Sequence, residues 1–264
     1  MIELTSQIIA LTLVSGVIVG LFLGTFGGGG SVLAAPLLIY LVGIEDPHVA
    51  IGTSAAGVAA IALVGLVGHW RGGRVKWPCA IVFALSGLVG SLLGSSLAKI
   101  TPGDILLLGF AAAMAMIAVS MFQRPKSAGD PDISLTPDMV LRLALIGLVV
   151  GIAAGFFGIG GGFLIVPGLM LAVGMTMANA TASSLVSVAI FGAATSANYA
   201  LSGMVDARIV LLLLCGGVLG GVVGILIAKG LADRVRIARI AFATMILAVA
   251  AFVAISASQS VFFS

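Results

Sequence analysis

The chain has 264 residues, of which 61% are hydrophobic and only 8% are charged, against about 25% charged residues in an average soluble domain. Together with a mean hydropathy of +1.31, this composition excludes an ordinary soluble protein and predicts an all-α integral membrane protein surrounded by lipid. The net charge of +3 is small, and because no basic groove with interleaved aromatic residues is present, no nucleic-acid partner is expected.

Ten apolar segments follow one another along the chain. The first five are 7–24, 31–44, 47–70, 77–98 and 103–122, and the second five are 139–157, 162–174, 178–200, 209–229 and 237–257. Most have the roughly 20 residues that a helix needs to cross a bilayer. The second segment of each set is too short, because about 14 residues of helix reach only ~21 Å.

Three helix starts can be read from the sequence. Asp46-Pro47, Thr101-Pro102 and Thr136-Pro137 each place an N-cap residue before a proline, which favours helices that begin at that proline. The first apolar segment has no preceding Lys or Arg and no evident cleavage site, so we interpret it as a span rather than a signal peptide.

The polar stretch 123–138 separates two halves, 1–122 and 139–264, that resemble each other. Gly24–Gly30 (GTFGGGG) aligns with Gly155–Gly161 (GFFGIGG), and Pro36 then aligns with Pro167. Further on, Gly87, Gly90, Gly94 and Lys99 recur in register as Gly217, Gly220, Gly224 and Lys229. This spacing predicts an internal duplication.

The distribution of basic residues predicts how the halves are oriented. Five crossings per half is an odd number, so the second half would insert upside down relative to the first. With 123–138 as a cytoplasmic linker, this inverted arrangement leaves only Lys99 and Arg208 outside among the twelve basic residues, as the positive-inside rule favours. The prediction is therefore two inverted-topology repeats of five apolar segments each, with both termini outside and short or broken helices where the repeats meet.

The broken helices are the candidate binding site. Glycine-rich stretches interrupt the chain just before each short segment, and the first four amides of a helix have no partner inside it. The peptide dipoles add a partial positive charge there, and glycine lets an anion approach. Because lipid cannot satisfy these amides, a water-lined or ligand-lined cavity is expected. A kink or packing notch is the alternative interpretation. The predicted substrate-binding residues of these loops are Gly27, Gly28, Gly29, Gly30, Ser31, Gly158, Gly160, Gly161 and Gly162.

Hydroxyl groups complete each half-site. Thr53 and Ser54 lie early in the third segment of the first half, and Ser183 and Ser184 lie at the matching place in the second. Under the inverted topology, the first glycine loop and the second hydroxyl pair open to the same side. Two half-sites of amides and hydroxyls without a fixed cation suit a small anion that must bind and leave again.

Few other residues carry chemistry. No acidic or basic residue falls in the middle of a predicted span, which disfavours a carboxylate proton relay. His69, Asn198 and Tyr199 are candidate pathway residues, with an interfacial anchor as the alternative for His69. Cys79 and Cys215 show no metal or disulfide spacing and are expected to be small buried hydrophobes. No cofactor, metal or catalytic residue is predicted, so the chain is expected not to be an enzyme.

Glycine stripes run along several segments. Gly16, Gly20 and Gly24, and the recurring set that begins at Gly87, have the small-xxx-small spacing of closely packed membrane helices. Packing within the chain is the simpler interpretation, and a homodimer interface is the alternative.

The paired motifs resemble a known family. GTFGGGGSVLAAPLL and GFFGIGGGFLIVPGLM, each followed by a hydroxyl-bearing AIGTSAA or ATASSLV, are similar to those of the sulfite exporter TauE/SafE family, also called the toluene sulfonate uptake permeases. The resemblance covers about 8–122 and 139–257. Ile159 and Ser183-Ser184 depart from the family pattern of a glycine and a Thr-Ser pair.

The resemblance implies a multi-pass carrier in the bacterial cytoplasmic (inner) membrane, where lipid and a small anion are its partners. Its substrates would be sulfite, sulfoacetate, another organosulfonate or a related anion. The function predicted from the residues and the resemblance together is a secondary transporter that exports such an anion by alternating access. A passive anion channel or uniporter is the alternative.

Overall fold

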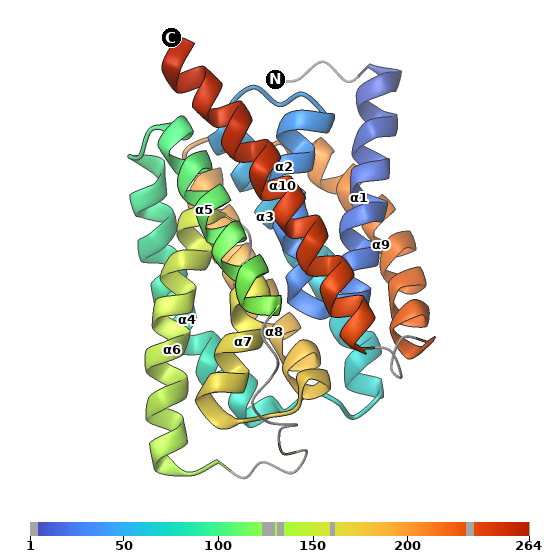
Figure 1. Cartoon of the computed structure of the whole chain (residues 1–264), viewed down its shortest axis with the longest axis vertical. Coiled ribbons are helices and arrows are strands. Elements are labelled where there is room, and N and C mark those ends of the chain that lie inside the picture. Colours follow the sequence, from blue (N-terminus) through green and yellow to red (C-terminus); the bar gives the residue numbers. More distant parts are fainter. Residues whose placement is uncertain (1–4, 123–129, 131–134, 159–161, 231–234, 264) are drawn as a thin grey trace.

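The computed structural model describes residues 5–122, 130, 135–158, 162–230 and 235–263. In this part of the chain the regular elements are all helical (Figure 1), which confirms the all-α class. The helices of the first half are α1 (Ser6–Phe26), the 3₁₀ turn η1 (Gly27–Leu33), α2 (Ala34–Pro36), the π-helical turn η2 (Leu37–Leu41), α3 (Pro47–Arg71), α4 (Trp77–Lys99) and α5 (Gly103–Phe122). Those of the second half are α6 (Pro137–Phe157), α7 (Gly162–Val173), α8 (Met177–Ala200), α9 (Ala207–Gly230) and α10 (Val235–Phe263).

The helices match the predicted apolar segments. Six helical segments of the described residues are long and apolar enough to cross a membrane, and three shorter apolar helices accompany them. By hydropathy Ser6–Leu41 forms one stretch of 36 residues. However, Gly27 ends α1 with φ 64° and ψ −142°, and the chain then turns back alongside α1 (Figure 1). The chain is thus a multi-pass membrane protein.

Two of the three predicted helix starts are confirmed. Asp46 caps α3, its carboxylate accepting a bond from the His48 amide at 2.8 Å, and α6 begins at Pro137. The third was wrong by one residue, since α5 begins at Gly103. Thr101 instead closes the end of α4, because its hydroxyl donates to the Leu97 carbonyl at 3.0 Å.

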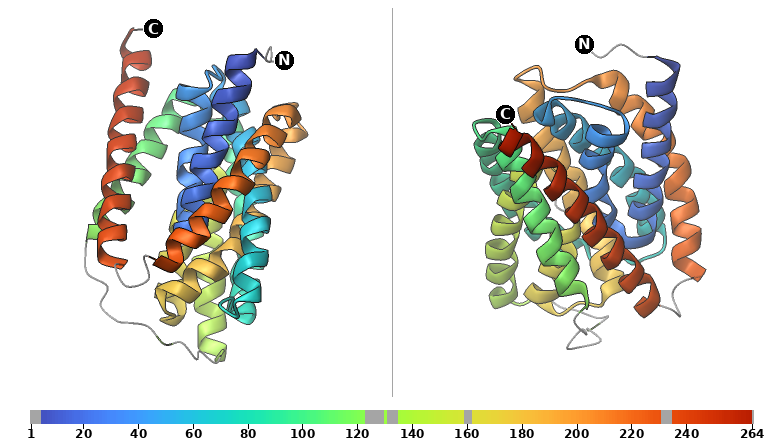
Figure 2. Two further views of the ribbon diagram at one scale, coloured as in Figure 1. Left: turned by 90° about the vertical axis from the view of Figure 1, so that its right-hand side faces the viewer. Right: turned by 45° about the horizontal axis from the view of Figure 1, so that its top comes forward.

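The helices α1 and α6 run in opposite directions through the bundle (Figure 1). The start of α1 and the end of α10 lie at one end, and the end of α5 and the start of α6 lie at the other (Figures 1 and 2). As a result α1 runs away from the end that holds the termini, whereas α6 runs toward it (Figure 1).

Glycines let helices from different halves pack closely. α1 packs against α9, and α6 packs against α4. A methyl group added at Gly20 would lie 2.7 Å from the Cα atom of Gly217, and one added at Gly151 would lie 2.6 Å from that of Gly87. Backbones approach this closely only where both residues lack a side chain. The interpretation of the glycine stripes as packing surfaces within the chain is therefore confirmed.

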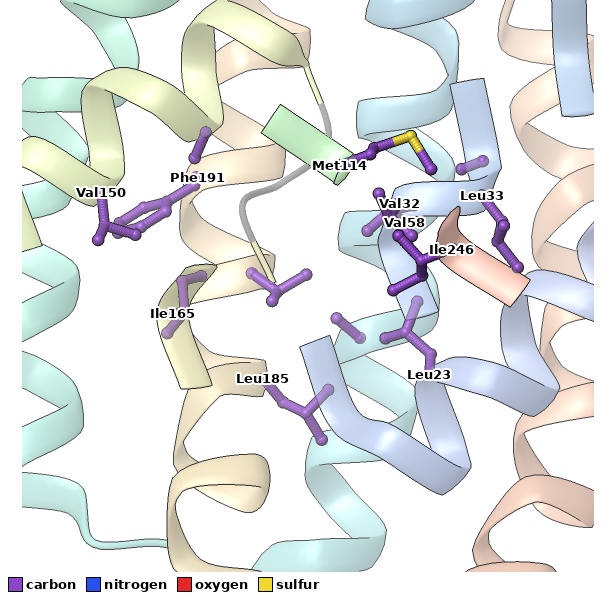
Figure 3. Close-up of a cluster of buried hydrophobic side chains, with 14 of the residues drawn as sticks. Leu23, Val32, Leu33, Val58, Met114, Val150, Ile165, Leu185, Phe191 and Ile246 are labelled. Carbon is purple, nitrogen blue, oxygen red and sulfur yellow. The ribbon is translucent and has the colours of Figure 1, made fainter. Parts of the chain in front are cut away.

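The remaining pairs also join the halves, since α3 packs against α8 and α5 against α10. One large apolar cluster draws on all of these helices (Figure 3), and it includes Leu23, Val32, Val58, Met114, Val150, Ile165, Phe191 and Ile246. Cys79 is buried as expected, but the expectation was wrong for Cys215, which is exposed.

We expect Gly20→Ala to lower the free energy of unfolding in detergent by about 1–3 kcal/mol, because the added methyl group would force α1 and α9 apart. Gly65→Ala is the matched control. Its methyl group would meet only the Cδ1 atom of Leu185, at 3.5 Å, and alanine favours a helix over glycine. Equal thermal stability of the two variants would contradict the packing argument.

Candidate functional site

The first glycine loop is buried between the two halves. All seven residues of η1 are buried. The Gly28 amide donates to the Ser184 hydroxyl at 3.2 Å, and the Ser31 hydroxyl donates to the Gly28 carbonyl at 2.8 Å. The hydroxyl that meets this loop thus comes from the second half of the chain.

The water-lined cavity predicted at this loop is not open in the described part of the chain. The physical reason lies in the 3₁₀ turn, which pairs an amide with the carbonyl three residues before it. Glycine tolerates this tight winding, and the Gly28 amide, near the start of the turn, has a partner in the Ser184 hydroxyl. Solvent is therefore not needed to satisfy the Gly28 amide.

The second loop also begins at a glycine with positive φ, although its ψ differs from that of Gly27. Gly158 ends α6 in the left-handed region, with φ 63° and ψ 21°, and Gly162 begins α7 and is buried. Gly160 and Gly161, both predicted to bind substrate, lie outside the described residues.

The two loops touch each other at the centre of the bundle. A methyl group at Gly28 would lie 2.5 Å from the Cα atom of Gly162 and 2.8 Å from its carbonyl oxygen. Around this contact the halves repeat each other's packing. Gly27 faces Thr181 on α8, and Gly158 faces Ile51, which stands at the matching place on α3.

The predicted hydroxyls divide into two kinds. Ser184 faces the first loop, while Ser54 donates to the Ile51 carbonyl at 3.0 Å, beside the second. Thr53 and Ser183 face away from the loops. The Thr53 hydroxyl accepts a bond from the Asp206 amide at 3.1 Å, and the Ser183 hydroxyl accepts one from the Lys76 amide at 2.9 Å.

The three predicted pathway residues do not form one group. Asn198 joins a polar cluster at the ends of α4 and α8, where its amide donates to Ser95 at 2.7 Å and to Ser96 at 3.0 Å, and its side-chain oxygen accepts from Lys99 at 2.8 Å. Tyr199 is fully buried with its hydroxyl unpaired, and its ring stacks on His48 with centroids 6.2 Å apart.

His69 lies inside the protein rather than at its surface. Its side chain is 6% exposed and its Nε2 atom has no partner, whereas the neighbouring Trp70 is 59% exposed. An interfacial anchor has to be exposed to the lipid headgroups, so Trp70 fits this role better than His69 does.

A pocket of about 570 Å³ lies away from the glycine loops. It is lined by the turn between η2 and α3 and by the turn between α8 and α9, including Glu45, Asp46, Val49, Asp206 and Arg208. Arg208 pairs with Asp206 at 3.5 Å, and the other charges here are acidic. An anion would find this pocket less favourable than the neutral amides and hydroxyls at the loops.

Sequence reasoning missed two hydroxyls on α8, Ser187 and Thr195. Both are fully buried and neither has a hydrogen-bond partner. Single serines and threonines in an apolar helix give no sequence signal, because they usually bond to the preceding turn of their own helix.

We expect Gly158→Ala and Ile51→Ala to be non-additive in stability, because the three described atoms nearest to a methyl group at Gly158 would all belong to the Ile51 side chain. The double variant should lose less free energy of unfolding than the sum of the singles, by about 1 kcal/mol or more. A left-handed alanine still costs about 1–2 kcal/mol.

Gly27→Ala with Thr181→Ser is the comparison pair. Here the methyl group would lie 2.5 Å from the Thr181 Cγ2 atom, which serine lacks, and 2.7 Å from the Thr181 backbone oxygen, which no side-chain change removes. The departure from additivity should therefore be smaller than at Gly158. Thermal unfolding of the six variants in detergent tests both statements, and additivity at Gly158 would contradict the collision.

The chain is similar in sequence to known membrane transporter proteins. Residues 12–253 match the family described as Sulfite exporter TauE/SafE, which confirms the resemblance noted in the sequence. The chain is 42% identical over 251 residues to a probable membrane transporter protein of Xylella fastidiosa (strain 9a5c), covering 95% of this chain and 96% of that protein. It is 26% identical over 213 residues to the probable membrane transporter protein YdhB of Bacillus subtilis (strain 168), covering 78% and 85%. No solved structure matches with significance. The chain therefore belongs to the TauE/SafE sulfite exporter family of membrane transporters.

Proposed function

We propose that this protein is a secondary transporter that exports a small sulfur-containing anion, such as sulfite, sulfoacetate or another organosulfonate, by alternating access. The proposal rests on one observation above all: glycine loops from the two halves meet backbone to backbone at Gly28 and Gly162. Substrates of secondary transporters bind where repeats meet at interrupted helices.

The proposed architecture is a pair of inverted repeats, 1–122 and 139–264, joined by a cytoplasmic linker at 123–138. The opposite directions of α1 and α6 (Figure 1) support it. The packing between the halves supports it as well. The first helix of each half packs against the fourth helix of the other, as α1 does against α9 and α6 against α4.

The chemistry of the loops favours an anion with several oxygen acceptors. The proposed ligands are Gly27–Ser31, Gly158, Gly160–Gly162, Ser54 and Ser184, which offer amides and hydroxyls but no charge. An ionised oxygen accepts a stronger bond from such donors than a neutral acceptor does, and the absence of a fixed cation lets the anion leave again. Sulfite and sulfonates present three oxygens on one sulfur atom, and the family's description names sulfite.

Alternating access explains why the loop is closed. The Gly28 amide is already bonded to Ser184, and all of η1 is buried. An anion that inserts between the Gly28 amide and the Ser184 hydroxyl, and accepts a bond from each, must separate α8 from the loop, so binding and opening are one event. A permanently open channel would not need a closed contact of this kind, which supports a carrier over the channel alternative.

The proposed location is the bacterial cytoplasmic membrane, with both termini outside. The distribution of basic residues supports this orientation, since only Lys99 and Arg208 of the twelve would lie outside.

We expect Ser184→Ala to weaken the apparent affinity for sulfite or sulfoacetate about tenfold, because one hydroxyl donor to a charged ligand is lost. Flux into proteoliposomes under imposed ion gradients measures this, with each anion tested separately. Ser15→Ala is the matched control: this serine is also fully buried, but its hydroxyl only donates to the Leu11 carbonyl of its own helix, at 2.8 Å.

Sulfite and sulfoacetate flux that is unchanged in Ser184→Ala would contradict the proposed site. If the wild-type protein transports neither anion, the proposed substrate class is wrong. Flux that never concentrates the anion, whichever ion gradient is imposed, would favour a uniporter.

A further inference from the structure

We infer that Thr53 and Ser183 are latches that hold the two ends of the transporter shut, rather than ligands of the substrate. The inference rests on the proposed alternating access and adds to it the residues that control each side.

Each latch closes on the same kind of turn. The connection from α3 to α4 passes through Gly73 with φ 67°, and that from α8 to α9 passes through Gly203 with φ 72°. In the first, the Arg74 amide donates to the His69 carbonyl at 3.4 Å, and in the second the Met204 amide donates to the Tyr199 carbonyl at 3.1 Å. The two turns therefore have matching caps, which present the next helix in the same way.

The latch bonds attach to the residue just before the next helix begins. Lys76 precedes α4 and donates its amide to Ser183, and Asp206 precedes α9 and donates its amide to Thr53. Both accepting side chains are fully buried. The first amides of a helix have no partner within it, so a buried hydroxyl at this place fixes where the helix starts.

The latches connect different halves. Thr53 on α3 holds the start of α9, and Ser183 on α8 holds the start of α4. Since α9 packs against α1 and α4 packs against α6, release of one latch frees one pair of helices and leaves the other pair held.

This geometry explains why two hydroxyls stand side by side in each half. Consecutive residues of a helix point about 100° apart. Ser184 faces the Gly28 amide while Ser183 faces the Lys76 amide, so one helical turn meets both a loop and a latch. A substrate that binds Ser184 and moves it therefore acts on the residue next to Ser183.

The two latches lie at opposite ends of the bundle. The start of α3 lies at the end that holds the termini, and the start of α8 lies at the other end (Figure 1). Asp206, together with Asp46 and Val49 of the α3 start, lines the 570 Å³ pocket, so solvent already reaches the outer side of the Thr53 latch. Both latches are closed in this structure, as an occluded carrier requires.

Side-specific labelling tests the latches without any substrate. Ala50 and Ala180, each three residues before a latch hydroxyl and each fully buried, serve as reporters. Ala50→Cys and Ala180→Cys are placed separately in a Cys79→Ala, Cys215→Ala background. A charged, membrane-impermeant maleimide is then applied to vesicles of each orientation.

We expect Thr53→Val to speed labelling of the Ala50→Cys reporter about three- to tenfold from one face, with the Ala180→Cys reporter unchanged. Ser183→Ala should do the reverse, from the opposite face. The range is what the loss of one hydrogen bond gives. Thr53→Ser and Ser183→Thr keep the acceptor and should label at the starting rate.

Unchanged labelling in both latch variants, or faster labelling of both reporters in each, would overturn the inference. Should Thr53→Val not insert into the membrane, Thr53→Ala takes its place with the same expected result. A different result would reject the proposed function, namely that the wild-type protein transports neither sulfite nor sulfoacetate. Normal wild-type flux with unchanged labelling would reject the latches alone.

Discussion

Close approach of bare backbone is the constraint on which this structure depends. At the centre, Gly28 and Gly162 allow two interrupted helices from different halves to touch. Towards the sides, Gly20 meets Gly217 and Gly151 meets Gly87 in the same manner. In a membrane, the burial of apolar surface contributes little to helix association, because lipid is itself apolar. Van der Waals contacts and interhelical hydrogen bonds therefore hold the helices together. Glycine favours the first of these, because no side chain separates the two backbones.

Much of the fold could be predicted from the sequence, because lipid imposes strict rules on the chain. Apolar runs have to be helical, and the predicted segments coincide with the helices to within a few residues. Asp46-Pro47 marked a helix start correctly because a carboxylate and a proline act within a few residues of each other. Thr101 was misplaced because a threonine can also bond backward to the turn before it.

The candidate site was less accessible to sequence reasoning. The loops were found because runs of glycine are rare in spans, but the burial of the first loop and its bond to Ser184 follow from packing in three dimensions. An interfacial anchor was the alternative interpretation of His69, yet its side chain is buried whereas that of the neighbouring Trp70 is exposed. The hydrogen bonds of Thr53 and Ser183 are made with Asp206 and Lys76, which lie far away in the chain. No local pattern carries that information.

The exchange of helices between halves has a consequence for biogenesis. While the ribosome is still making the second half, α1 and α4 are already in the membrane without α9 and α6, the helices that cover their glycine faces. The nascent first half would then expose the glycine faces of α1 and α4, and each could pack against another helix that carries small residues. Swift synthesis of the remainder, or a chaperone that shields those surfaces, would protect it from pairing with a neighbouring copy. Splitting the gene between the halves should consequently yield fragments that mature only when made together.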